Sequence, residues 1–211
     1  VVEANEDYLI QDIRQLQADL ASIGWRTEGY VQGLRLGCHL YAPLLYSEKV
    51  AIRPVALNES EFRFVNDLRL WLQAHEASLQ AQGKHLFLLR NLAKRGVGFF
   101  EAGNFFPDFI LWCVMQDGKQ RISFIDPHGL EHEGPGSDKI VFSENIKRLE
   151  QRLSDVDVSL ESFILSPSAN RLRVEHLWTQ QGQPVPDLDA LHVLFMPEAD
   201  YLNKLLAIAT A

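Results

Sequence analysis

The chain of 211 residues is 46% hydrophobic and 10% aromatic, and it carries a formal net charge of −8. This length permits one or two domains with a substantial core, and the share of apolar residues is typical of a soluble globular protein. The acidic charge argues against a surface coated in DNA-binding cations, while the lack of an apolar run of about 18 residues and of a secretory signal argues against a membrane partner.

Two segments precede the region with the clearest pattern. Residues 5–22 have apolar side chains at helical spacing on one face, which predicts an outer helix. Residues 30–56 are less regular and are interrupted by two prolines, so the sequence leaves open whether they form a small sheet or a bridge. We assign residues 1–50 to an N-terminal helix and connecting segment, and residues 51–211 to a single domain.

The second domain begins with a predicted helix. Asn58 and Glu61 have the spacing of a capping box, and apolar residues follow on one face. The helix should run to about Gln82 and end at Gly83. Residues 85–92 then indicate a strand.

A hairpin follows this strand. Residues 109–115 are a continuous apolar run, which is typical of a strand that is buried on both faces. Gln116-Asp117-Gly118 is a hairpin turn signal, and residues 121–125 alternate as the second strand.

The rest of the chain alternates between helix and strand. The segment 171–180 is ambiguous between the two. The other expected elements are a loop at 132–138, a helix at 139–153, a strand at 158–165, a loop at 182–187, a strand at 191–196 and a helix at 198–208. This order indicates an α/β layer fold with a central sheet of four to five strands, a helix on each face and an N-terminal helical extension.

The hairpin delivers two acids to one edge of the sheet. Asp108 enters the first strand and Asp126 leaves the second, so a tight hairpin would place them about one strand spacing, roughly 5 Å, apart. Two carboxylates on adjacent strands suit a hard cation such as Mg²⁺, and such an ion can activate water against a phosphodiester. Alternatively, each Asp is a turn residue that hydrogen-bonds local backbone amides.

The same residues resemble the PD-(D/E)xK nuclease superfamily. Pro107-Asp108 is followed by a strand–turn–strand and then by Asp126-Pro127-His128. The wider run of LNESEFRFVNDL, LFLLRN, FFPDFILW and FIDPHGL is similar to the nuclease-like domain at the C-terminal end of DEAD/DEAH-box helicases and of type III restriction subunits. The resemblance covers roughly residues 50–135. It implies a restriction-endonuclease-like mixed sheet and, for a chain that begins Val-Val, a longer parent protein with a helicase/ATPase domain.

The resemblance also implies roles for individual residues. Asp108, Asp126 and the backbone carbonyl of Pro127 would bind Mg²⁺ or Mn²⁺. Glu61 matches the acid of the family's helix, which is a further metal ligand or orients water, although a capping box explains Glu61 fully. His128 stands where the family usually has Lys. It would orient the attacking water, stabilise charge on the phosphate, or bind the metal.

Three functions remain open. The first is a Mg²⁺-dependent endonuclease that hydrolyses DNA, with Glu61, Asp108, Asp126 and His128 as catalytic residues. The second is a catalytically inactive nuclease-fold module that binds DNA or its parent protein, which the Lys-to-His change and the acidic charge favour. The third is a protein–protein interaction domain in which the acids only form turns.

Composition adds two weaker expectations. Five basic residues near the hairpin either line a local groove for DNA or are solvated surface charges; they are Arg90, Lys94, Arg95, Lys119 and Arg121. The two cysteines give no disulfide framework, so we expect a cytoplasmic protein.

Overall fold

The structure is a computed structural model that describes most of the chain after residue 56. The described residues are 57–91, 106–130, 133–168, 171–180, 182 and 185–211, together with the backbone of 32–33 and 45–46. The helix predicted at 5–22 lies outside these residues. Within 30–56, the short strands β1 (Gln32–Gly33) and β2 (Leu45–Tyr46) pair antiparallel, so this part contains a small sheet.

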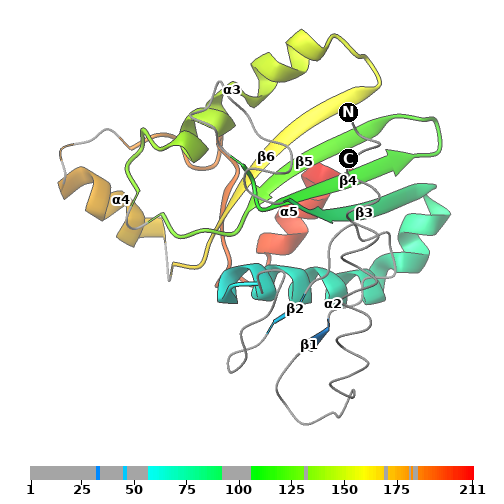
Figure 1. The fold of residues 1–211 in the computed structure, drawn as a ribbon, viewed down its shortest axis with the longest axis horizontal. Coiled ribbons are helices and arrows are strands. Elements are labelled where there is room, and N and C mark those ends of the chain that lie inside the picture. Colours follow the sequence, from blue (N-terminus) through cyan, green and yellow to red (C-terminus); the bar gives the residue numbers. More distant parts are fainter. Residues whose placement is uncertain are drawn as a thin grey trace, which may run out of the picture.

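A five-stranded mixed sheet forms the centre of the described part of the chain after residue 56 (Figure 1). The first three strands pair antiparallel with one another, and the last two continue the sheet in parallel with the third. In the order in which they lie side by side, the strands are β3 (Lys84–Arg90), β4 (Phe109–Met115), β5 (Gln120–Asp126), β6 (Val158–Ser166) and β7 (Val193–Phe195). This sheet confirms the predicted α/β class and the predicted number of strands.

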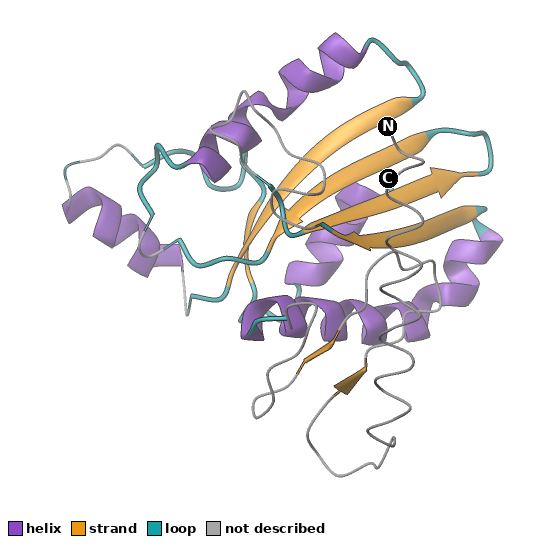
Figure 2. Ribbon diagram, in the orientation of Figure 1, coloured by secondary structure: helices purple, strands orange, loops and turns teal. Residues whose placement is uncertain are grey.

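Helices cover both faces of the sheet (Figure 2). Helices α2 (Glu59–Ala81) and α5 (Tyr201–Ala209) pack on one face, and α3 (Asp138–Leu153) packs on the other. The segment that was ambiguous in sequence is a helix, α4 (Arg171–Gln180). Figure 1 shows α4 to one side of the sheet, beyond the strand ends that lead into α3.

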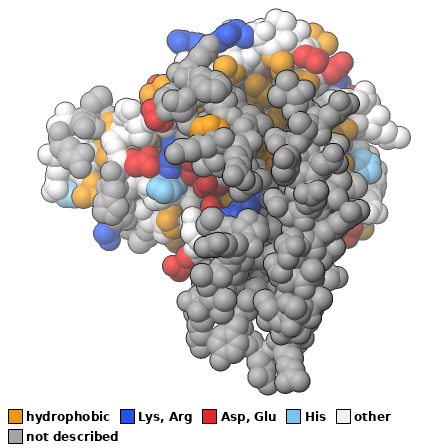
Figure 3. Space-filling model, in the orientation of Figure 1, with side chains coloured by type: hydrophobic (Ala, Val, Ile, Leu, Met, Phe, Trp, Pro, Cys, Tyr) orange, Lys and Arg blue, Asp and Glu red, His pale blue; other side chains and the backbone are white. Residues whose placement is uncertain are grey.

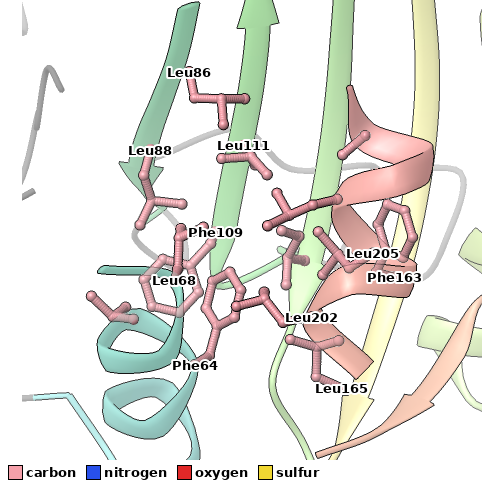
Figure 4. Packing of buried hydrophobic residues seen from close by; sticks show 14 of the residues in the cluster. Phe64, Leu68, Leu86, Leu88, Phe109, Leu111, Phe163, Leu165, Leu202 and Leu205 are labelled. Atoms are coloured by element: carbon pink, nitrogen blue, oxygen red, sulfur yellow. The ribbon is translucent and has the colours of Figure 1, made fainter. Parts of the chain in front are cut away.

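The two faces of β4 enter different cores, as its continuous apolar run predicted. Phe109 and Leu111 pack toward α2 and α5, and Phe109 lies 5.4 Å from Phe64 between ring centroids. Figure 4 shows this cluster between α2, the sheet and α5. Ile110 points the other way, into the cluster under α3. A third cluster is centred on the fully buried Trp178 of α4.

The capping box fixes where α2 begins. The Asn58 side chain accepts a hydrogen bond from the Glu61 amide at 2.9 Å, and the Asn58 amide donates to Glu61 Oε2 at 2.9 Å. Two amides that a helix leaves unpaired at its start are thereby satisfied. The predicted helix start is confirmed, and the Glu61 side chain is held near the end of the sheet.

Candidate functional site

The hairpin register brings the two predicted acids to the same end of the sheet. Phe109 pairs with Ile125, so Asp108 and Asp126 are the next residues outward on β4 and β5. Asp126 also lies beside Ile164 of the parallel strand β6. The charge of Asp126 contributes to raising the pKa of Asp108, as expected for two carboxyl groups that are close in space.

Asp126 is the most deeply buried acid of this group. Only 4% of its surface is exposed. An ion pair joins the Lys139 ammonium to Asp126, with 3.3 Å between Nζ and Oδ1, and Oδ1 has no other partner among the described residues. Burial raises the pKa of Asp126, and the positive charges of Lys139 and His128 oppose that rise. A carboxylate oxygen that has a single ion-pair partner can still accept a further donor or cation.

Asp108 is half-buried, and its environment disfavours a second negative charge. Burial, with the negative charges of Asp126 and Glu61, raises the pKa of Asp108 from 3.8 to about 8, although the charges of Lys139 and Arg90 act in the opposite direction. Near neutral pH the side chain therefore holds a proton for much of the time. A divalent cation would displace that proton, because metal-binding carboxylates must be ionised.

Glu61 reaches the same end of the sheet from α2. Its Oε2 accepts the capping bond from Asn58, and it lies 3.4 Å from Arg90 Nη2. Arg90 is 8% exposed, and its pKa is lowered by burial while the charges of Glu61 and Asp108 act in the opposite direction. Glu61 thus has structural partners, and its charge still acts on Asp108.

A second contact from α2 reaches the loop after β5. The Ser60 hydroxyl donates a hydrogen bond to the Pro127 carbonyl at 2.6 Å. A carbonyl oxygen has two lone pairs, so Pro127 can accept this bond and still offer a ligand. Ser60 therefore fixes the direction of the carbonyl that the sequence suggested as a metal ligand.

His128, which the resemblance to the PD-(D/E)xK nucleases aligns with a lysine, lies closer to the surface than Asp126. The His128 side chain is 54% exposed, and its Nε2 is 3.6 Å from Glu133 Oε1. The cation that contacts Asp126 is instead Lys139, whose side chain is only 12% exposed. Lys139 also contacts Glu133, with 3.1 Å between Nζ and Oε1. The structure thus brings together Asp108, Asp126, Glu61 and Arg90 with Lys139, and leaves His128 at the rim.

Sequence reasoning missed Lys139 because its partner lies on a different element. One local signal was available: Lys139 is in the first turn of α3, where the helix dipole favours acids over cations. A lysine at that position needs another partner, and here the partners are Asp126 and Glu133.

Three of the five basic residues near the hairpin are described by the structure, and they lie at different places with partners of their own. Arg90 is buried against Glu61. Lys119 pairs with Asp117, and Arg121 donates to the Ala211 carbonyl, both at the other end of the hairpin. On the face in Figure 3, the described Lys and Arg side chains are interspersed with acidic side chains rather than gathered in a band. Lys94 and Arg95 lie outside the described residues.

The donors present suit a hard cation with few protein ligands. Among the described residues, no group of three or more His, Cys, Asp or Glu side chains is placed to hold a metal ion. Mg²⁺ does not need such a group, because it usually keeps several waters and takes one or two carboxylates. Asp108, Asp126 and the Pro127 carbonyl meet that requirement in chemical type, and Asp126 Oδ1, whose one partner among the described residues is Lys139, has capacity for a further cation.

Comparison with protein-family models, with curated proteins and with solved structures found no match for this chain. The structure itself shows an α/β fold, with a mixed five-stranded sheet packed with helices. Within the part of the chain described here, none of the helices has the length and apolar character needed to cross a membrane.

Proposed function

We propose that this domain is a Mg²⁺- or Mn²⁺-dependent endonuclease that hydrolyses DNA phosphodiesters. The observation that carries the proposal is the buried Asp126 carboxylate next to Asp108 at one end of a mixed sheet, where Oδ1 has Lys139 as its one partner among the described residues. The resemblance of Pro107-Asp108 and Asp126-Pro127-His128 to the PD-(D/E)xK nucleases supports it. That resemblance also suggests that the domain belongs to a longer helicase or restriction-type protein of the cytoplasm.

Each residue of the site has a definite part in this proposal. Asp108, Asp126 and the Pro127 carbonyl would hold the ion, which when bound lowers the pKa of a coordinated water and polarises the phosphate. Glu61, fixed by its capping bond, would orient water at the edge of the pair. Lys139 would offset negative charge that builds on the phosphate, the part that the family usually gives to the Lys at the position of His128.

His128 is placed to meet the substrate before the buried acids do. Its ring is more than half exposed and lies beside Glu133. A neutral imidazole can accept a proton and a protonated one can contact phosphate. We assign His128 to substrate contact at the rim, while Lys139 carries the buried positive charge.

One observation favours a catalytically inactive module instead. Lys139 and Arg90 already neutralise part of the acid cluster from within the protein. A site balanced in this way could dock on DNA or on the parent protein without metal. Calorimetric titration with Mg²⁺ and Mn²⁺ separates the two functions, because only the nuclease requires binding at millimolar metal.

The nuclease is tested by incubating the protein with plasmid DNA and Mg²⁺ or Mn²⁺, with a chelator as the blank. Asp108→Ala should reduce cleavage by about 10²-fold or more, the scale for losing one group that stabilises the transition state. Asp117→Asn is the matched control, because Asp117 is exposed at the opposite end of the same hairpin. If Asp108→Ala cuts as fast as the Asp117→Asn control, the assignment is refuted.

A further inference from the structure

The Lys139 ammonium is shared between two carboxylates of unequal burial. It lies 3.3 Å from Asp126 Oδ1 and 3.1 Å from Glu133 Oε1. Asp126 belongs to the buried acid pair, whereas the Glu133 side chain is 24% exposed. A lysine side chain is a compact cation on a flexible four-carbon stem, so a small movement of Nζ is enough to favour one acceptor over the other.

The contact with Asp126 leaves that oxygen available. The ammonium offsets the negative charge of Asp126 as its ion-pair partner, and Oδ1 has no further partner among the described residues. Lys139 thus stands where a second cation would approach the same atom. Two cations on one carboxylate oxygen repel each other, so an incoming ion would drive the ammonium away.

Glu133 is held in place to receive the ammonium. The Trp178 indole N–H donates to the Glu133 backbone carbonyl. Trp178 is fully buried in the cluster that also contains Leu130 and Ile140, which flank Glu133 along the chain. Trp178 of α4 therefore anchors the Glu133 backbone next to the start of α3.

We propose that Lys139 is an exchangeable internal counter-ion: it balances Asp126 in the metal-free protein, and a divalent cation displaces it onto Glu133. This inference rests on the proposed metal site, and it states that Lys139 and Glu133 determine how tightly that site binds a divalent cation. Glu133 is then a positioning residue for metal binding, since it determines how readily Lys139 leaves Asp126.

The experiment is a double-mutant cycle read by calorimetric titration with Mn²⁺. Lys139→Met should tighten Mn²⁺ binding by about tenfold, and Glu133→Gln should weaken it by a similar factor, within the range of coupling between contacting residues. In the Lys139→Met background, Glu133→Gln should have only a small effect, because the ammonium that Glu133 accepts is gone. Lys147→Met is the control, since Lys147 also lies on α3 but pairs with Glu150 and Glu161.

Folding of each variant is checked by thermal melting with and without Mn²⁺. If Lys139→Met does not fold, Lys139→Arg gives the test in the opposite direction: guanidinium holds carboxylates more firmly than ammonium and should weaken Mn²⁺ binding several-fold. The melting temperature of Lys139→Arg should then rise less on adding Mn²⁺ than that of the parent.

The outcomes separate this inference from the proposed nuclease. If the parent does not bind Mn²⁺ but Lys139→Met does, the counter-ion role is supported and activity of the parent is not. If Lys139→Met binds no tighter than Lys147→Met, or if Glu133→Gln has its full effect in both backgrounds, the exchange is refuted although the metal site stands. If no variant binds Mn²⁺, both proposals are refuted.

Discussion

The protonation of Asp108 leads to a quantitative prediction for Asp108→Asn in the metal-free protein. The unfolded chain loses this proton near pH 3.8, whereas the folded protein keeps it to about pH 8. Between these values the folded state binds more protons, so its stability falls as pH rises and then levels off above pH 8. Asparagine has the same shape as aspartate and no charge, and it removes this loss.

The size of this loss of stability follows from the pKa shift of Asp108. A change from 3.8 to about 8 corresponds to about 6 kcal/mol at about 1.4 kcal/mol per pKa unit. Asp108 is only half-buried, and part of the repulsion comes from the charge of Asp126. A single substitution at Asp108 should therefore increase the free energy of unfolding by less than this full amount. We expect Asp108→Asn to be more stable than the parent by on the order of 2 kcal/mol at alkaline pH, and nearly equal to it in mild acid.

Urea denaturation with a chelator present, at about pH 5 and about pH 9.5, measures both differences by linear extrapolation. Millimolar Mg²⁺ should then stabilise the parent at the higher pH and leave Asp108→Asn almost unchanged, since ligand binding stabilises only a folded state that binds the ligand. Equal stabilities at the higher pH, or a difference that does not depend on pH, would show that Asp108 is not held protonated by its neighbours.

Two further predictions concern α2. Leu68→Ala should cost about 2–5 kcal/mol of stability, because Leu68 is fully buried in the core of Figure 4. Leu70→Ala, at a half-exposed position on the same helix, should change urea stability little; similar losses would contradict the packing. Ser60→Ala should weaken Mn²⁺ binding by about 10-fold by freeing the Pro127 carbonyl, the scale for groups that orient a metal ligand. Ser78→Ala, on the exposed part of the helix, is its calorimetric control, and an equal affinity in both variants would remove Ser60 from the site.

The fold could be predicted where the pattern was local. The capping box of Asn58 and Glu61, the apolar run of 109–115 and the turn at 116–118 each act within a few residues, and all three are confirmed. A hairpin with a short turn has little freedom of register. The meeting of Asp108 and Asp126 therefore followed from the sequence, although their proposed metal binding did not and stays a prediction.

The remainder of the site depends on contacts between distant elements. The sequence allowed Arg90 to be a groove residue or a surface charge, because nothing near it in sequence indicates that Glu61 lies against it. In sequence, Lys139 is one polar residue of a predicted amphipathic helix. Only the packing of α3 on the sheet brings it to Asp126. The ambiguity of 171–180 has the same origin, since its buried residues Val174 and Trp178 face a cluster formed by other segments.

The charge balance of the proposed metal site predicts that a cation and a proton would compete there. Four described carboxyl groups meet at this end of the sheet, on Glu61, Asp108, Asp126 and Glu133, against the two cations Arg90 and Lys139. With all of them ionised, the cluster has two negative charges in excess, in surroundings where unpaired charge is costly. A proton on Asp108 supplies one positive charge and leaves the Asp126 oxygen with Lys139 as its one partner among the described residues. One divalent cation supplies both charges and a further partner for that oxygen, so metal affinity should rise with pH as Asp108 loses its proton.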